Sequence, residues 1–365
     1  MPSTKQWTSK IFRQKVLTVT IIYLCFSWGI SLYNRSLLYS EWYEQPVQTL
    51  DPWIEFIIAT VIGLVAGIVG GSFLISIYER VFKTKSFGYS WALTFVFFVA
   101  IFLIIVVLIN VILLVSRLND NESFSETLTY TLETALSPTL ISTFFLWSLV
   151  IVLTVFFLQI NDKFGPGILR KFIRGDYHRP KLEDRLFMFL DMRSSTVIAE
   201  QLGNTAYFNL LQEVFLDLTD PIIAHRGEIY QYVGDEIVIS WKLDNEEAPK
   251  WAIQCFFAIQ SKLLELADTY ESKHGVRPEF KAGIHHGTVT AGEIGSIKKD
   301  IVYSGDVLNT TARIQEQCNA FKVDIILSEA TKKLVDTGKL VFRELGVIEL
   351  RGKEEKVGLF TVSLN

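Results

Sequence analysis

The sequence predicts a bundle of four transmembrane helices followed by an α+β domain. Half of the 365 residues are hydrophobic, and before residue 161 they gather into four long apolar runs. After residue 180, short apolar runs of strand character alternate with stretches of helical period. We therefore expect a membrane domain over residues 1–160, a cytoplasmic linker over 161–180 and a soluble domain over 181–365.

The four apolar runs are each long enough to cross a bilayer as a helix, which takes about 20 residues. They cover residues 16–33, 53–77, 91–115 and 138–160, and none carries a charge at its centre. A cleaved signal peptide is the alternative for the first run, but no small-residue cleavage site follows IIYLCFSWG. We therefore expect the N-terminal part to be embedded in the membrane.

The basic residues around these runs predict the topology, because Lys and Arg are retained on the cytoplasmic side. Four precede the first run and three lie between the second and third: Lys5, Lys10, Arg13 and Lys15, then Arg80, Lys83 and Lys85. The other two connections carry only Arg35 and Arg117. We expect a multi-pass protein of the plasma membrane, the inner membrane in a bacterium, with both termini and the soluble domain in the cytoplasm.

Three glycines, Gly63, Gly67 and Gly71, recur at every fourth position of the second run and so share one helix face. Small residues on such a face let another helix approach closely. We predict packing within the bundle, with a contact between protomers as the alternative. The outer connections are too short for a folded sensor domain, so the bundle either reads a signal itself or serves as an anchor.

Charge and cysteine content narrow the class of protein. The net charge is -4, without a large basic cluster, which argues against nucleic acid as a partner. The three cysteines, Cys25, Cys255 and Cys318, are not placed for an external disulfide and lack the Cys-x-x-Cys spacing of a zinc site. We expect structural thiols.

The soluble domain mixes strand and helix patterns. RLFMFLD predicts a buried strand, NTAYFNLLQEVFLDLT a helix, and IYQYVGDEIVIS two strands joined by a tight Gly-Asp turn. A long helix over 248–273, the strand FKAGIHHG, a helix around VLNTTARIQEQ and closing strands near VFRELGVIEL and VGLFTVSL follow. This pattern predicts a sheet covered on one face by helices.

Two carboxylates stand at chain reversals of this domain. Asp191 ends the first strand and precedes MRSST, in which Ser194 can cap the next helix, while Asp235 lies in the Gly-Asp turn. An Asp in such a turn is, taken alone, more often a turn residue. Together the two acids suit Mg²⁺ with phosphate, since magnesium takes one or two carboxylates and fills its other positions with phosphate oxygens and water.

Four motifs, FMFLDMRSSTVIAEQLG, YQYVGDEIVISW, GIHHGTVTAGEIG and YSGDVLNTTARIQ, occur in this order. Together they resemble the catalytic domain of class III adenylate and guanylate cyclases, over residues 183–363. The resemblance implies a ferredoxin-like α+β fold and conversion of ATP to 3',5'-cyclic AMP and pyrophosphate for intracellular signalling.

The resemblance also implies roles for single residues. Asp191 and Asp235 would hold two metal ions per site, Mg²⁺ or Mn²⁺. Asn309 would orient the ribose, Arg313 would stabilise charge on the transferring phosphorus, and Arg351 in LRGKEEK would bind the terminal phosphates. In the family the metal acids come from one subunit and the Asn and Arg from the other, so a head-to-tail homodimer is implied.

Gln231 and Val302 occupy the positions where the family selects the base, and they match neither the usual adenine pair nor the usual guanine pair. A register shifted by one residue around DIVYSGD is the alternative, which would place Ile301 or Tyr303 at the second position. ATP is favoured as the commoner substrate of the family, with GTP or a pyrimidine triphosphate as alternatives. A catalytically weak, membrane-tethered nucleotide-binding module is a further alternative. A diguanylate cyclase is disfavoured, because Asn309 and Arg313 have no counterpart in that scheme.

His285 and His286 are adjacent in a predicted strand, so their side chains point to opposite faces and cannot readily chelate one ion together. We interpret both as structural.

Overall fold

The computed structural model describes residues 4–38, 51–78, 86–119, 129, 137–164, 174–297, 299–335, 340–349 and 356–364. The chain divides into two compact units. One comprises Ser9–Leu169, and the other comprises Arg170–Asn365 together with Met1–Thr8.

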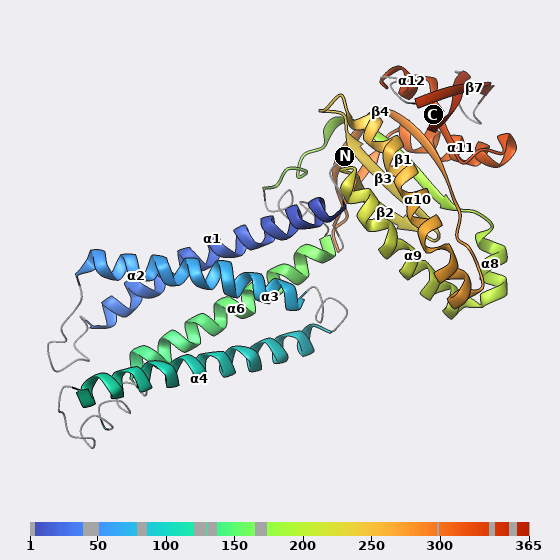
Figure 1. Cartoon of the computed structure of the whole chain (residues 1–365). Coiled ribbons are helices and arrows are strands. Elements are labelled where there is room, and N and C mark those ends of the chain that lie inside the picture. The colour runs from blue at the N-terminus through green and yellow to red at the C-terminus, as the bar shows by residue number, and fades with distance from the viewer. Residues whose placement is uncertain are drawn as a thin grey trace. The chain divides into compact units, whose positions relative to one another are not determined.

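The first unit is built of long helices that run alongside one another (Figure 1). They are α1 (Thr4–Leu38), α2 (Pro52–Val65), the π-helical turn η1 (Ala66–Gly70), α3 (Gly71–Ile77), α4 (Phe87–Asn119) and α6 (Pro138–Phe164). Within the described residues, three stretches are long and apolar enough to cross a membrane: Phe12–Ser36, Pro52–Ile77 and Leu140–Asn161. The fourth expected span lies in α4, whose apolar stretch in the described part, Gly88–Ile104, is shorter.

The glycine face of the second span packs against α1. A Cβ atom added at Gly63 would lie 2.8 Å from Leu24 Cα, and one added at Gly67 would lie 2.5 Å from Thr20 Cα. Nearby, Ser27 Oγ donates a hydrogen bond to the Ala59 carbonyl at 2.6 Å. The predicted close packing within the bundle is confirmed, because only glycine permits backbones this near to each other.

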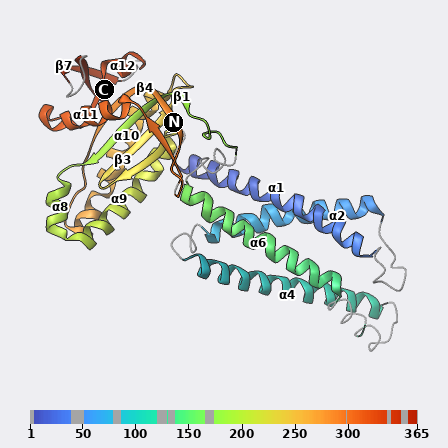
Figure 2. The same ribbon diagram turned by 180° about the vertical axis from the view of Figure 1, so that it is seen from behind.

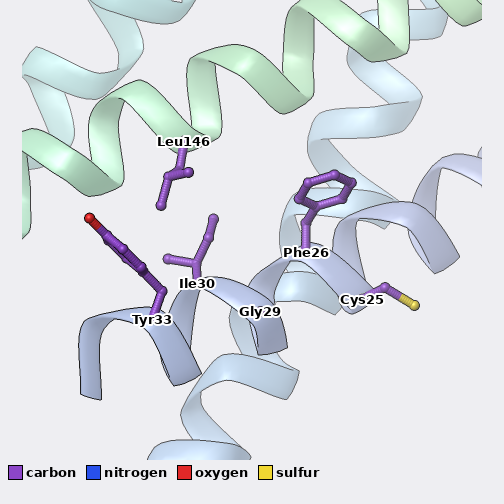
Figure 3. A pocket seen from close by; sticks show the side chains of 6 residues that line it. All are labelled: Cys25, Phe26, Gly29, Ile30, Tyr33 and Leu146. Carbon is purple, nitrogen blue, oxygen red and sulfur yellow. The ribbon is translucent and has the colours of Figure 1, made fainter. Parts of the chain in front are cut away.

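A cavity of about 390 Å³ lies between α1 and α6. Figure 3 shows Leu146 of α6 facing Ile30 of α1, with Tyr33 beside them and the Cys25 sulfur turned outward. The full lining is Cys25, Phe26, Gly29, Ile30, Tyr33 and Leu146. These walls are almost entirely apolar, so the cavity provides a hydrocarbon-like surface.

The second unit contains one mixed sheet, which in the described part has eight strands. They are β1 (Lys181–Met192), β2 (Glu228–Val233), β3 (Glu236–Lys242), β4 (Phe280–Ile294), β5 (Asp300–Ser304), β6 (Ile325–Ser328), β7 (Leu340–Glu349) and β8 (Lys356–Leu364). The order is β2-β3-β1-β4-β6-β8-β7, and β5 pairs with β4. Only the β4–β6 pairing is parallel among these described strands. The predicted β2–β3 hairpin is confirmed.

Helices pack on both faces of this sheet. The helices α8 (Ser195–Leu202), α9 (Asn204–Ala224) and α10 (Ala248–His274) cover the face to which β1 contributes Leu186, Met188 and Leu190 (Figure 1). The opposite face, seen in Figure 2, carries a second apolar cluster that includes Phe187 and Phe189. Successive side chains of β1 thus alternate between two cores, as a strand's period of two requires.

The helix α11 (Asp306–Phe321) packs on that opposite face, which the expectation of helices on one face did not include. Val307 belongs to the cluster around Phe187, and a Cβ atom added at Gly283 of β4 would lie 2.5 Å from Gln315 N. The missing side chain at Gly283 therefore lets α11 lie directly on β4. The short helix α12 (Glu329–Lys333) follows β6.

Candidate active site

Asp191 lies at the end of β1, where three strands align. It pairs in register with Glu236 of β3 and with Lys281 of β4, so the three side chains share one face of the sheet. Asp191 Oδ2 accepts a hydrogen bond from Lys281 Nζ at 3.1 Å and another from Gln315 Nε2 at 2.8 Å. The carboxylate is therefore held in a fixed orientation.

Asp235 lies next to this carboxylate, in the tight turn between β2 and β3. The turn is possible because Gly234 adopts φ +62°, a left-handed conformation that glycine takes without strain. Burial raises the pKa of Asp191; Lys281 opposes this shift, and the negative charge of Asp235 adds to it. The hairpin thus brings a second negative charge close enough to Asp191 to disfavour its ionisation.

Glu236 is a third carboxylate of this group, and the sequence analysis did not single it out. Burial, followed by the charges of Asp191 and Asp235, raises the pKa of Glu236 to about 7. Burial and the charge of Asp235 also raise the pKa of Tyr207, on α9. Three acids and the ion-paired Lys281 thus share one sheet end that is partly removed from water.

The donor set suits a divalent cation. Carboxylate oxygens are the ligands that Mg²⁺ and Mn²⁺ prefer, and a cation relieves the repulsion between the buried acids. No cluster of three or more His, Cys, Asp or Glu positioned to hold a metal by itself occurs among the described residues. Magnesium held by one or two carboxylates has its other positions filled by substrate oxygens and water.

Ser194 occupies the N-cap position of α8, as expected, but its backbone is left-handed at φ 55° and its side chain makes no capping hydrogen bond. The predicted N-cap position is therefore correct, but the predicted side-chain hydrogen bond of the cap is wrong. A side-chain cap requires an extended N-cap backbone, and the sharp turn after β1 does not provide one.

Asn309 and Arg313 lie one turn apart on α11, Asn309 exposed and Arg313 half-buried. Neither side chain forms a hydrogen bond or an ion pair with any residue that the structure describes. Gln315, which reaches Asp191, is only 4% exposed and lies two residues after Arg313, about 200° around the helix. Arg313 therefore lies on nearly the opposite side of α11 from the residue that reaches Asp191, and Asn309 lies about 120° from it.

The two expected base-selecting positions lie on different strands. Gln231 is exposed on β2, just after a β-bulge, and Val302 is half-buried on β5. The residues beside them are in contact, since the Tyr303 backbone N–H donates to the Tyr230 hydroxyl at 3.3 Å. Arg351, expected on the terminal phosphates, lies outside the described residues.

Lys281 and Gln315 were not among the site residues predicted from the sequence. Both contact Asp191 only because β1 pairs with β4 and α11 lies on β4. Each stands within a quoted motif region, FKAG and ARIQ, so the motifs indicated the segments but not the contacts.

The two histidines each bond to the start of α12. His285 Nδ1 is 2.7 Å from Ser328 Oγ, and His286 Nδ1 is 3.2 Å from Thr331 Oγ1. Ser328 in turn caps the helix by accepting from Thr331 N. These contacts agree with the structural interpretation, because both rings bond to a helix start.

Comparison with known proteins assigns the second unit. A family model described as the adenylate and guanylate cyclase catalytic domain matches residues 179–363. Adenylate cyclase 2 of Rhizobium meliloti is 30% identical over 210 residues, which are 57% of this chain and 58% of that protein. Adenylate cyclase 1 of the same organism is 28% identical over 183 residues, 48% of this chain and 27% of that protein. The chain thus spans little more than half the length of the first relative and about a quarter of the length of the second.

Among solved structures, the adenylyl cyclase CyaB from P. aeruginosa is 20% identical, with a TM-score of 0.47 over 51% of this chain and 97% of that chain. The family match covers the whole sheet and its helices, including Asp191, Asp235, Asn309 and Arg313. This chain belongs to the class III adenylate and guanylate cyclase family, and its α+β unit is the cyclase catalytic domain.

Proposed function

We propose that the protein is a membrane-anchored nucleotidyl cyclase that converts ATP to 3',5'-cyclic AMP and pyrophosphate. The observation that carries this proposal is the pair of carboxylates at the sheet end, with Asp191 fixed by Lys281 and Gln315 and Asp235 held beside it by the hairpin. A site of this kind is suited to a triphosphate bound with divalent cations. The likeness to two bacterial adenylate cyclases supports ATP as the substrate.

Asp191 and Asp235 would hold two divalent ions, Mg²⁺ or Mn²⁺. When bound, these ions supply positive charge that lowers the pKa of the ribose 3'-hydroxyl and offsets the charge of the triphosphate. In the reaction the 3'-oxygen forms a bond to the α-phosphorus while the bond to the bridging oxygen breaks. Pyrophosphate leaves with that electron pair, and the hydroxyl proton passes to water.

The other half of the site would come from a second copy of the chain. Asn309 would orient the ribose and Arg313 would stabilise charge on the transferring phosphorus. Both side chains lack partners among the described residues, and neither lies on the side of α11 from which Gln315 reaches Asp191. A head-to-tail homodimer places each Asn and Arg pair opposite the acids of the partner and completes two equivalent sites.

The membrane part would serve this enzyme as a four-pass anchor or sensor, with both termini and the catalytic domain in the cytoplasm. Three apolar helices in the described part, together with α4, supply the spans. We propose the division into a membrane domain over 1–160, a linker over 161–180 and a catalytic domain over 181–365. Reporter fusions at the three connections and at both ends test this topology, and an external C-terminus would contradict it.

The choice of nucleobase depends on Gln231 and Val302. Gln231 offers an amide that both donates and accepts hydrogen bonds, whereas Val302 offers neither a donor nor an acceptor. GTP or a pyrimidine triphosphate is therefore the second candidate substrate, and a membrane-tethered module that binds nucleotide with little turnover is the alternative to an enzyme.

A substrate panel tests the proposal directly. The full-length protein in detergent is given ATP, GTP, CTP or UTP with Mg²⁺ or Mn²⁺, and cyclic products are identified by mass. We expect cyclic AMP from ATP, and none from Asp235→Asn protein. A different cyclic nucleotide as the product would show that the proposed substrate, ATP, is wrong. If none of the four triphosphates gave a cyclic product, the proposed cyclase activity would be refuted.

A further inference from the structure

Two tyrosines adjoin the base-selecting positions and contact each other. Tyr230 directly precedes Gln231, and Tyr303 directly follows Val302. Their ring centroids are 4.9 Å apart, and the Tyr303 N–H donates to the Tyr230 hydroxyl at 3.3 Å. The strands β2 and β5 pair with different neighbours in the sheet, so this contact joins two strands that share no ladder.

A β-bulge brings Gln231 next to Tyr230 at this point of the sheet. The register of β2 against β3 shifts between Ile229 and Gln231, which leaves Tyr230 as the extra residue. Its ring packs into the cluster around Phe187, with ring centroids 6.5 Å apart. Without the bulge Tyr230 would pair with Val238, a member of that cluster, and Gln231 would lie on the other face. The bulge instead pairs Gln231 with Val238, so Tyr230 and Gln231 are adjacent at the same point of the sheet.

A buried arginine lies against the same pair. The guanidinium of Arg185 is 4.5 Å from the centre of the Tyr303 ring, and the residue is 0% exposed. It donates hydrogen bonds to three side chains, Glu183 at 2.8 Å, Glu228 at 3.1 Å and Ser240 at 3.0 Å. These bonds fix the plane of the guanidinium under the Tyr303 ring.

This arrangement is costly for a purely structural core. Burying a charged group is expensive even when it is paired, and Arg185 Nη2 has no hydrogen-bond partner in the described part of the chain. Apolar residues of similar volume would fill the same space with less loss of hydration. The cost suggests that the position of Tyr303, rather than stability, is what Arg185 secures.

We propose that Arg185, Tyr303 and Tyr230, here called the tyrosine stack, position Gln231 and Val302 and thereby set which nucleobase the site prefers. The inference rests on the proposed function, because it takes these two positions as the ones that face the base. Selective recognition requires groups held to within about 0.5 Å of the productive geometry. The members of the stack are positioning residues and need not touch the base.

Tyr230→Phe tests this with the smallest change, since it removes one hydroxyl and keeps the ring. We measure the Kd of full-length protein in detergent, with Mn²⁺, for analogues of ATP and GTP in which a methylene replaces the bridging oxygen between the α- and β-phosphorus. Pyrophosphate cannot leave these analogues, so turnover does not affect the result. We expect the ratio of the two Kd values to change about threefold or more, the effect of one lost hydrogen bond on positioning.

Tyr270→Phe is the matched control. Tyr270 is a buried tyrosine of α10 whose hydroxyl donates to Asp217 at 2.5 Å, on the face of the sheet away from the stack. Tyr270→Phe, like Tyr230→Phe, removes one hydrogen bond of a tyrosine hydroxyl. The Tm should therefore fall by a comparable amount in both variants, while in Tyr270→Phe the Kd ratio stays at the wild-type value. At the stack itself, Tyr303→Leu should change the ratio, and Tyr303→Phe, which keeps both the ring and the backbone N–H, should restore it.

Each outcome is decisive. A Kd ratio in Tyr230→Phe equal to that of the wild type overturns the inference, as does an equal change in Tyr270→Phe. Analogue binding by wild-type protein that makes no cyclic nucleotide refutes the proposed enzyme but leaves the stack to be judged by its Kd ratio. Failure of the wild type to bind either analogue overturns both.

Discussion

The side-chain amide of Gln315 donates a hydrogen bond to Asp191 Oδ2 at 2.8 Å, although 124 residues separate the two in sequence. The contact is possible because Gly283 lets α11 lie directly on β4. The helix α11 also carries Asn309 and Arg313. If the proposed shared site is correct, this one amide would link the helix that serves the partner's site to the carboxylate of the chain's own site.

Replacing this amide should weaken metal binding. Gln315→Met keeps the volume and removes the donor, and we expect the half-saturating Mn²⁺ concentration for cyclic nucleotide formation to rise about tenfold, a typical loss for an outer-shell partner of a metal ligand. The matched control is Gln260→Met on α10, whose amide donates to the Phe280 carbonyl at 2.7 Å. An unchanged metal requirement in Gln315→Met would show that Asp191 needs no such support.

Sharing of sites between chains can be measured by mixing two inactive variants. Under the proposed roles, Asp235→Ala would lack a metal acid and Arg313→Ala would lack the phosphate-stabilising cation, so a mixed dimer would keep one intact site of its two. Random pairing of equal amounts should recover about a quarter of wild-type activity in a two-fold symmetric dimer. Differently tagged chains confirm that mixed dimers form, and no recovery in the presence of such dimers would exclude shared sites.

An ion pair between two helices of the catalytic domain should make the free energy of unfolding depend on pH. Glu213 of α9 accepts from His274 at 3.0 Å and from Lys273 at 2.5 Å, both at the end of α10, and these bonds lower the pKa of Glu213. Because the pKa is lower in the folded state, the stabilisation is present above the unfolded pKa of about 4.3 and is lost as pH falls through the folded value.

We therefore expect Glu213→Gln to lower stability at pH 7 by less than about 1 kcal/mol, since the pair is partly exposed and screened. The difference in thermal unfolding from the wild type should shrink as pH is lowered to about 3. Glu265→Gln, which breaks a surface pair with Lys262 inside one helix, is the control. A difference that grows on acidification would contradict the sign of the shift.

Packing of the glycine face can be tested with two alanine substitutions one turn apart. Gly67→Ala forces a Cβ atom to 2.5 Å from Thr20 Cα, so α1 and the second span must separate. Gly70→Ala meets nothing within 4 Å. In detergent we expect a clear fall in the thermal unfolding temperature for Gly67→Ala alone. Equal temperatures in the two variants would mean that the helices separate here in solution.

Local patterns predicted the order of helices and strands, because both the alternation of side chains in β1 and the Gly-Asp turn that contains Asp235 depend on residues adjacent in sequence. The roles of Asp191 and Asp235 followed from motifs that carry them together. Lys281, Gln315 and the stacking of Arg185 on Tyr303 depend on which strands pair and which helix lies on them. Such contacts join segments that are distant in sequence, so the periodicity within one segment cannot predict them.

The place of Asn309 and Arg313 on α11, off the side that reaches Asp191, has a consequence for the rate of cyclic nucleotide formation. If every site needs two molecules, output per molecule depends on how crowded they are in the bilayer. At low surface density the cyclic nucleotide produced would rise with the square of the number of molecules, and doubling expression would then yield about four times the signal. Expression level and lateral clustering in the membrane would then both regulate the rate of cyclic nucleotide formation per molecule.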